Sequence, residues 1–516
     1  MKNERQSINL NGKVFFPPII ILILTIGYSL YDNEHYMKLT NGFNRWILET
    51  LGGVFSWSAF LFLIILIAVY FSPLGKVTIG GKDAEPILTK WRWFAIALCT
   101  TIATGILFWG MAEPLHHFEA PPKGLDATAQ SSEALQFSMS TMFMHWSFTP
   151  YAIYTVTALM FALTYYNLKQ PFRISSLVYP LFGKKVHGGL GVGLDVMCLY
   201  ALVAGMSASL GAGIFALMGG LDIVLNIPNS TLLMGLIGFA IVVAFIISAA
   251  SGLKRGIRIL SDFNIKAFLA LATFVFIFGP TREILQMSWS GLIDYVVHLV
   301  PRSTNVGSSI DIEWQYSWTI FYWANWFAWA PIAALFLGRL AVGYTVRQLI
   351  HFNLIFPSLF AILWMMIFSG TALHFDMVSD GTLYKMMVAE GEENVMYEVF
   401  NQLPFGKVVS LCALVMVFIS YVTAADSNIS AMSAMSTVGI SPENPEAPLI
   451  IKVVWGILIG TITWVMISSA GIDGIRILSI LGGFPALFII ILVAIGVIKL
   501  IWSTSLVKGE YEIGSK

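Results

Sequence analysis

The segment 316–330 is rich in aromatic side chains and contains no charged residue. Four tryptophans recur along it, namely Trp318, Trp323, Trp326 and Trp329. The faces of aromatic rings carry negative quadrupole density, so several faces together can hold a quaternary ammonium cation without a counter-charge. The segment therefore suggests a site for a methylated amine.

A second aromatic group follows His145 and comprises Trp146, Tyr151 and Tyr154. Trp146 and Tyr154 are eight residues apart, which places them on similar faces of a helix, and Pro150 between them should bend that helix. Together with Trp326 these rings can close a box around a trimethylammonium group. The alternative is that they form an interfacial aromatic belt or ordinary core.

The composition indicates that these segments lie in a membrane. The 516-residue chain is 57% hydrophobic and only 11% charged, whereas soluble proteins carry roughly 25% charged residues. Its zero net charge argues against a nucleic-acid partner. Since a membrane helix needs about 20 apolar residues, the sequence predicts an all-α polytopic membrane protein. Its twelve predicted spans lie near 15–31, 56–72, 92–112, 139–164, 190–219, 231–250, 264–280, 315–338, 348–370, 406–436, 450–468 and 476–501.

The loops between these spans differ in charge. Lysines and arginines precede the first span and follow the second, fourth, sixth and eighth, whereas acidic residues gather in 113–133 and 376–398. This bias places both termini in the cytoplasm. We expect the chain to lie in the cytoplasmic (inner) membrane. The segment 281–314 carries apolar residues at helical spacing, which predicts an amphipathic helix on the outer surface.

The spans group into two sets of five. Residues 92–280 hold spans 3–7 and residues 315–501 hold spans 8–12, and an odd number of crossings gives the two sets opposite topology. They follow an N-terminal tail with two accessory spans (1–91) and precede a short cytoplasmic tail (502–516). Two inverted five-helix units are a common transporter architecture with the site near midplane.

Several polar residues fall within or beside spans. Asp426 lies inside the tenth span, where an ionisable residue is functional by default or pairs with a helix end. Thr423 can offer a hydroxyl oxygen to sodium or bond back to its own helix. Glu113, before Pro114, is expected at a helix end, as an outer gate or a solvated terminus. His116 and His117 are expected at the surface.

Three classes of function compete. A carrier for a quaternary amine fits the inverted halves and the aromatic box, whereas a channel needs weak multi-site binding along an open pore. A membrane-embedded enzyme would need a facing nucleophile and base or a metal set, and the sequence offers no such constellation. We therefore expect a transporter without a cofactor, with Na+ as the one candidate coupling ion.

At this point the motifs resemble those of the betaine/carnitine/choline transporter family. The most specific string is Trp318-Thr319-Ile320-Phe321-Tyr322-Trp323-Ala324-Asn325-Trp326. Further matches are Phe108-Trp109-Gly110 with Glu113-Pro114, His145-Trp146, Gly256-Ile257-Arg258-Ile259-Leu260-Ser261 and Ala425-Asp426-Ser427. The opening Lys13-Val14-Phe15-Phe16-Pro17-Pro18 looks especially like the carnitine/γ-butyrobetaine exchanger branch.

The resemblance implies a leucine-transporter-like fold, a homotrimer, and transport of trimethylammonium compounds by alternating access. It implies a substrate box of Trp146, Tyr151, Tyr154 and Trp326, with Trp329 on the cytoplasmic exit side and Trp323 in the same string. The family usually has Trp where this chain has Tyr151 and Asn325. Asn325 adds an amide beside the box that can favour a carboxylate or hydroxyl on the substrate.

The same comparison bears on coupling. Exchangers replace the cation by an Arg and a Met at the positions of Asn264 and Ala333, so neither substitute is present here. Sodium-coupled members use carbonyls near Cys99 and Ile102 and two hydroxyls of the tenth span. Thr423 keeps one hydroxyl, Ala424 lacks the other, and Ser420 is a further candidate. Sodium symport is favoured over sodium-independent exchange, and the substrate stays open among glycine betaine, carnitine, γ-butyrobetaine and choline.

Overall fold

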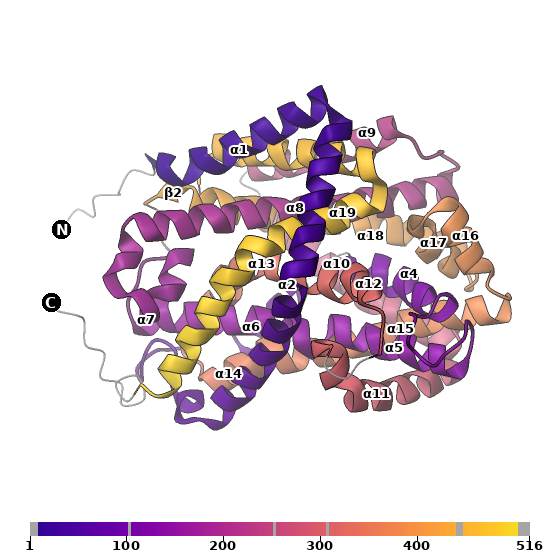
Figure 1. The fold of residues 1–516 in the computed structure, drawn as a ribbon, viewed down its shortest axis with the longest axis horizontal. Coiled ribbons are helices and arrows are strands. Elements are labelled where there is room, and N and C mark those ends of the chain that lie inside the picture. Colours follow the sequence, from indigo (N-terminus) through magenta and orange to yellow (C-terminus); the bar gives the residue numbers. More distant parts are fainter. Residues whose placement is uncertain (1–8, 102–104, 251–253, 306–308, 440–446, 504–516) are drawn as a thin grey trace.

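The computed structural model describes residues 9–101, 105–250, 254–305, 309–439 and 447–503. The described chain is almost entirely helical (Figure 1). The longer helices are α1 (Gly12–Tyr31), α2 (Asn33–Phe71), α3 (Lys90–Thr101), α4 (Gly105–Glu119), α5 (Ser132–Trp146), α6 (Phe148–Ala162), α8 (Gly189–Leu225), α9 (Thr231–Ala250), α10 (Lys254–Phe278), α11 (Thr281–Thr304), α13 (Phe321–Arg339), α15 (Phe356–Val378), α18 (Gly406–Met435) and α19 (Leu449–Ile501).

Short elements connect these helices. They are η1 (Pro73–Lys76), η2 (Leu163–Asn167), η3 (Ile174–Val178), α7 (Tyr179–Phe182), η4 (Gly183–His187), α12 (Ile312–Gln315), η5 (Tyr316–Ile320), α14 (Val346–Ile350), η6 (His351–Ile355), α16 (Thr382–Glu390), η7 (Glu392–Asn394) and α17 (Val395–Asn401). Strands β1 (Asn9–Leu10) and β2 (Thr437–Val438) form one antiparallel pair.

Many of these helices are long and apolar enough to cross a bilayer. Within the described ranges eight meet that criterion, or up to nine if α10 and α11, bent by 103° at their junction, count as one broken span. The chain is therefore a multi-pass, all-helical membrane protein. The number of twelve spans and their inverted-repeat relationship stay predictions.

Two helix breaks shape the interior. The predicted span 139–164 is split at Ser147, whose φ of −117° and ψ of −118° are not helical. Pro150 lies one turn later, and its ring and missing N–H disfavour a helical bond to the carbonyl of Trp146. In α19 the break is at Gly471, whose φ of 57° suits glycine. This break separates the predicted spans 450–468 and 476–501.

Helix α13, which carries the aromatic string, is held by close backbone contacts on two sides. A methyl group added at Gly483 of α19 would lie 2.4 Å from the carbonyl oxygen of Ala324, and one added at Gly338 would lie 2.7 Å from that of Ala158 on α6. Glycine at these positions therefore lets α6, α13 and α19 pack closely, as small residues do in membrane helices.

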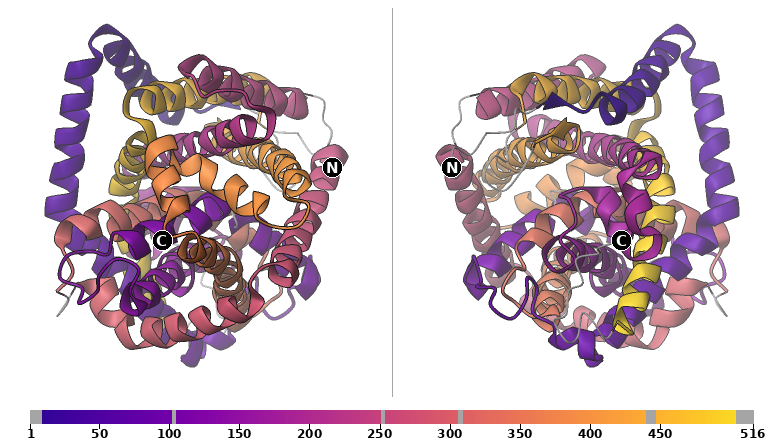
Figure 2. Two further views of the ribbon diagram at one scale, coloured as in Figure 1. Left: turned by 90° about the vertical axis from the view of Figure 1, so that its right-hand side faces the viewer. Right: turned by 90° about the vertical axis from the view of Figure 1, so that its left-hand side faces the viewer.

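The periphery differs from this interior. Figure 2 shows the long helix α2 standing at the edge of the molecule. Helix α11 exposes a stripe of large apolar residues comprising Trp289, Ile293, Val296, Val297 and Val300. This stripe agrees with the predicted amphipathic character, although the helix ends at Thr304 rather than continuing to residue 314.

The two ends of the described chain lie on one side. In Figure 1 the beginning of α1 and the end of α19 are both on the left, with α7 near them, and α16 and α17 lie on the right. The lysine-containing loop around α7 and the acidic segment 376–398 therefore occupy opposite ends of the molecule.

Candidate functional site

The aromatic side chains predicted to form a box lie together around Trp326. Its ring centroid is 4.8 Å from that of Tyr154, 5.6 Å from that of Tyr151 and 6.0 Å from that of Trp146. All four side chains are buried. Trp326 comes from α13 and the other three flank the break at Ser147, so the α5–α6 break and α13 together position the cluster.

The rings of this cluster contact one another directly. The pairs involving Trp326 are tilted or edge-to-face rather than stacked, with interplanar angles of 55° to 77°. Aromatic pairs prefer such non-parallel arrangements because the positive edge of one ring meets the negative face of another. A cation can use those faces once the rings separate.

Behind Trp146 lies a buried carboxylate that sequence reasoning placed elsewhere. Glu113 is fully buried inside α4, which continues past Pro114 to Glu119. The prediction of a helix end or solvated terminus is therefore wrong. The carboxylate accepts hydrogen bonds from the Trp146 indole (3.2 Å) and the Tyr322 hydroxyl (2.5 Å) at Oε2.

Two histidines complete this network. His145 pairs through Nδ1 with Glu113 Oε1 (2.6 Å) and through Nε2 with Thr319 Oγ1 (3.0 Å). His117 pairs through Nε2 with Glu113 Oε1 (3.3 Å), and its Nδ1 accepts the indole N–H of Trp314 (3.4 Å). His117 is fully buried, so its predicted surface position is wrong, whereas His116 is partly exposed.

The hydrogen bonds of this network explain how the charge of Glu113 can be buried. An unpaired buried charge is strongly unfavourable, whereas one that accepts several hydrogen bonds is tolerated. The facing atoms of Glu113, His117 and His145 lie within 4.8 Å of one another. Each of them has a hydrogen-bond partner within the network.

A protein cation lies against aromatic rings nearby. The guanidinium of Arg476, on α19 shortly after the break at Gly471, is 4.9 Å from the ring centroid of Trp318 and 5.9 Å from that of Trp109. Trp318 also contacts His117, at a centroid distance of 4.8 Å. Aromatic faces at this end of the site therefore already hold a positive charge.

The remaining residues of the aromatic string face other partners. Trp323 is buried, with its ring centroid 5.8 Å from that of His145. The amide oxygen of Asn325 accepts a hydrogen bond from Ser479 on α19 (3.2 Å), so this amide is directed toward α19.

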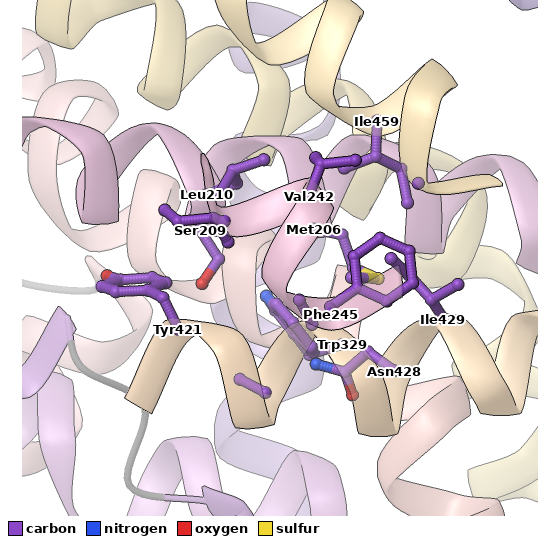
Figure 3. Close-up of a pocket in the computed structure, with 14 residues that line it drawn as sticks. Met206, Ser209, Leu210, Val242, Phe245, Trp329, Tyr421, Asn428, Ile429 and Ile459 are labelled. Atoms are coloured by element: carbon purple, nitrogen blue, oxygen red, sulfur yellow. The ribbon is translucent and has the colours of Figure 1, made fainter. Parts of the chain in front are cut away.

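Trp329 lines a separate, small cavity of about 30 Å³. Figure 3 shows its ring beside the amide of Asn428 and between Tyr421 and Phe245. The cavity is formed by α8, α9, α13, α18 and α19 and is mostly apolar. Because Trp329 follows Trp326 by three residues, the two lie on neighbouring positions of one helix face.

The predicted ion ligands are only partly described. Ile102 lies outside the described residues, and the side chain of Cys99 does too. Thr423 donates its hydroxyl to the carbonyl of Ile419 (2.9 Å), which is the back-bonding alternative, while Asp426 is partly buried within α18. Ser420 accepts a hydrogen bond from the amide of Asn264, which comes from α10.

Sequence reasoning missed several participants. Tyr322 and Thr319 were visible in the aromatic string, and His145 was visible beside Trp146, but no local spacing links them to Glu113. Tyr322 is 209 positions from Glu113 along the chain, and His145 is 32 positions away. The signal available in the sequence was a glutamate with two histidines nearby in an apolar part of the chain.

Comparisons with known proteins show which family the chain resembles. A family model described as betaine/carnitine/choline family transporter (BCCT) matches residues 13–505. The glycine betaine transporter of Acinetobacter baylyi is 27% identical over 96% of this chain and 74% of its own length. The high-affinity choline transport protein of Escherichia coli K12 is 28% identical over 97% of this chain and 73% of its own length. The ectoine/hydroxyectoine transporter of Virgibacillus pantothenticus is 29% identical over 94% and 95%.

The family match covers nearly the whole chain and the relatives align over most of their length. This chain therefore belongs to the betaine/carnitine/choline transporter family and is a membrane transporter rather than an enzyme.

Proposed function

We propose that this chain takes up a quaternary ammonium compound, such as glycine betaine, choline or carnitine, by secondary active transport. The observation that carries this proposal is the buried cluster of Trp146, Tyr151 and Tyr154 around Trp326. Four aromatic side chains from three helices, α5, α6 and α13, match what a trimethylammonium group requires. The carboxylate of Glu113, which accepts the indole N–H of Trp146, adds a negative charge at the edge of the same ring.

The contacts within the box support the proposal of alternating access. Because the rings touch, the cluster as described leaves no room for a trimethylammonium group between Trp326 and Tyr154. Binding requires these rings to separate, and the non-helical break at Ser147 lies next to Trp146. We assign this break as the hinge, and the cavity at Trp329 as the start of the route toward the cytoplasm.

Sodium is the proposed coupling ion. Thr423 uses its hydroxyl hydrogen to bond its own helix, which leaves the oxygen lone pairs available to a hard cation. Asn264, at the position of the exchangers' Arg, reaches Ser420, and its Oδ1 is buried with no hydrogen-bond partner among the described residues. The side-chain oxygens of Thr423, Ser420 and Asn264 support a cation near α10 and α18.

The remaining features of the proposal come from the resemblance and the charge pattern. They are the leucine-transporter-like inverted repeats, the homotrimer, the inner-membrane location and the cytoplasmic termini. The placement of both chain ends on one side in Figure 1 supports the orientation. The alternative is sodium-independent exchange of carnitine-type betaines.

Uptake into proteoliposomes tests these proposals. Radiolabelled glycine betaine, choline and carnitine are supplied with a sodium gradient, without sodium, or with internal unlabelled substrate. Accumulation that collapses without sodium supports symport. Sodium-independent uptake that needs internal substrate supports exchange, and uptake of none of the three under any condition contradicts the proposed substrate class.

A further inference from the structure

We propose that Glu113 and His145 form a proton-binding site behind the aromatic box, and that a proton there competes with the cationic head of the substrate. The inference rests on the proposed function for the identity of the substrate. It assigns a role to the buried network, which the aromatic box alone does not require.

The first step identifies the group that takes the proton. An indole N–H only donates, so Trp314 requires a lone pair on His117 Nδ1, and protonating that nitrogen breaks the bond. His145 instead meets the hydroxyl of Thr319 at Nε2 (3.0 Å). A hydroxyl donates to neutral imidazole and accepts from imidazolium, so His145 keeps both hydrogen bonds in either state.

The second step links this proton to the box. Glu113 accepts one hydrogen bond from His145 and another from the indole of Trp146, a wall of the box. With neutral His145 the pair carries one negative charge at the N–H edge of that wall. With protonated His145 the pair is neutral.

The third step gives the sign and size of the coupling. A cation on the face of Trp146 lies on the order of 7 Å from the carboxylate, since aromatic–cation contacts extend to about 6 Å. At an effective dielectric constant of about 20, a unit charge at that distance changes an equilibrium constant roughly 50-fold. The substrate cation therefore binds the deprotonated pair more tightly, and by linkage its binding releases the proton.

Other titratable groups on the surrounding elements do not replace this pair. On α4 they are His117 and His116, the latter 3.5 Å from Glu392 on η7. On α13 the group is Tyr322, bonded to Glu113. On α19 the charged group is Arg476, which lies over the ring of Trp318. On α11 the charged groups are Asp294 and Arg302, which form an ion pair. Arg302 also donates a hydrogen bond to Ser140 on α5.

The experiment measures substrate affinity against pH on the full-length protein in detergent. Competition against radiolabelled choline and glycine betaine gives Kd between pH 5.5 and 8.5. We expect the wild-type Kd to rise as pH falls, by at most about sixfold per pH unit and by roughly 50-fold in total. We expect His145→Gln to flatten this dependence while still binding. The matched control His116→Gln should keep the wild-type slope.

Two further measurements keep the test decisive. Thr319→Val removes the hydroxyl that accepts the Nε2–H of the imidazolium, so the pH dependence should move toward lower pH even if His145→Gln fails to fold. Substrate added to weakly buffered wild-type protein at low pH should release protons, and the neutral analogue 3,3-dimethylbutanol should release fewer.

The outcomes separate the two proposals. Absence of binding by every amine in the wild type refutes the proposed function and the inference together. Binding with a pH-independent Kd, with a slope of opposite sign, or with a slope that persists in His145→Gln overturns the proton site alone.

Discussion

Trp326 contacts all three other walls of the box, so replacing it tests the cation site most directly. We consider Trp326→Leu, which keeps an apolar side chain but removes the ring. The ring is buried and lies within 4.8 to 6.0 Å of its three partners, so a bound cation is desolvated. Desolvated cation–aromatic contacts contribute about 2 kcal/mol, which corresponds to a roughly 30-fold rise in Kd.

The assay compares a charged and a neutral ligand of the same shape. Choline and 3,3-dimethylbutanol compete with radiolabelled probe on the purified full-length protein. We expect the affinity for choline to fall roughly 30-fold and the affinity for the neutral analogue to fall only a few-fold. The reason is that only choline interacts with the quadrupole of the ring. Equal losses for both ligands would show that Trp326 supplies only apolar contact.

A matched control separates binding from folding. Replacing a buried tryptophan can destabilise a fold by about 3 to 5 kcal/mol through the cavity that remains. Trp364 of α15 is equally buried and packs against Phe368 and Phe360, away from the box. Trp364→Leu should lower thermal stability but leave choline affinity within twofold. An unchanged choline Kd in Trp326→Leu would refute the box.

Three further predictions follow from packing, burial and charge. Gly483→Ala places a methyl 2.4 Å from the carbonyl oxygen of Ala324 and should lower stability by about 1 to 3 kcal/mol in thermal unfolding, whereas Gly53→Ala, with open space, should not. Burial raises the pKa of Glu393, between α16 and α17, to about 7, so the folded state holds this proton longer than the unfolded state does. Stability should therefore fall by on the order of 3 kcal/mol between pH 4.5 and 7, and melting of Glu393→Gln at pH 5 and 8 should show a smaller difference. Asn264→Arg places a guanidinium beside Ser420 and should make uptake sodium-independent; a sodium requirement that persists would contradict the cation site there.

Local patterns predicted the parts of the site that depend on helical geometry. The spacing of Trp146 and Tyr154 placed both on one face, and both do contact Trp326, although the helix between them breaks at Ser147. Proline chemistry predicted a disruption near Pro150 and did not determine the residue at which the helix breaks. The length of the apolar runs predicted a multi-pass protein.

Long-range packing determined the burial of Glu113 and His117, which local sequence patterns did not predict. Pro114 suggested a helix end, yet α4 continues to Glu119 with Glu113 buried among partners from α5 and α13. The burial of His117 likewise depends on Trp314, 197 positions away along the chain. Pairing of buried charges is a tertiary property, and one sequence read in local windows does not encode the partner.

The small sheet of β1 and β2 has a consequence for the order of biogenesis. Leu10 pairs with Thr437 and Asn9 with Val438, and the amide of Asn11 continues the contact to Ser436. The partners are roughly 430 residues apart, so at 5–20 residues per second a ribosome needs roughly 20 to 85 s to make the second strand after the first. During this interval the edge of β1 is unpaired. The native connection between the first helix and the end of α18 is therefore among the last contacts that a newly made chain can form.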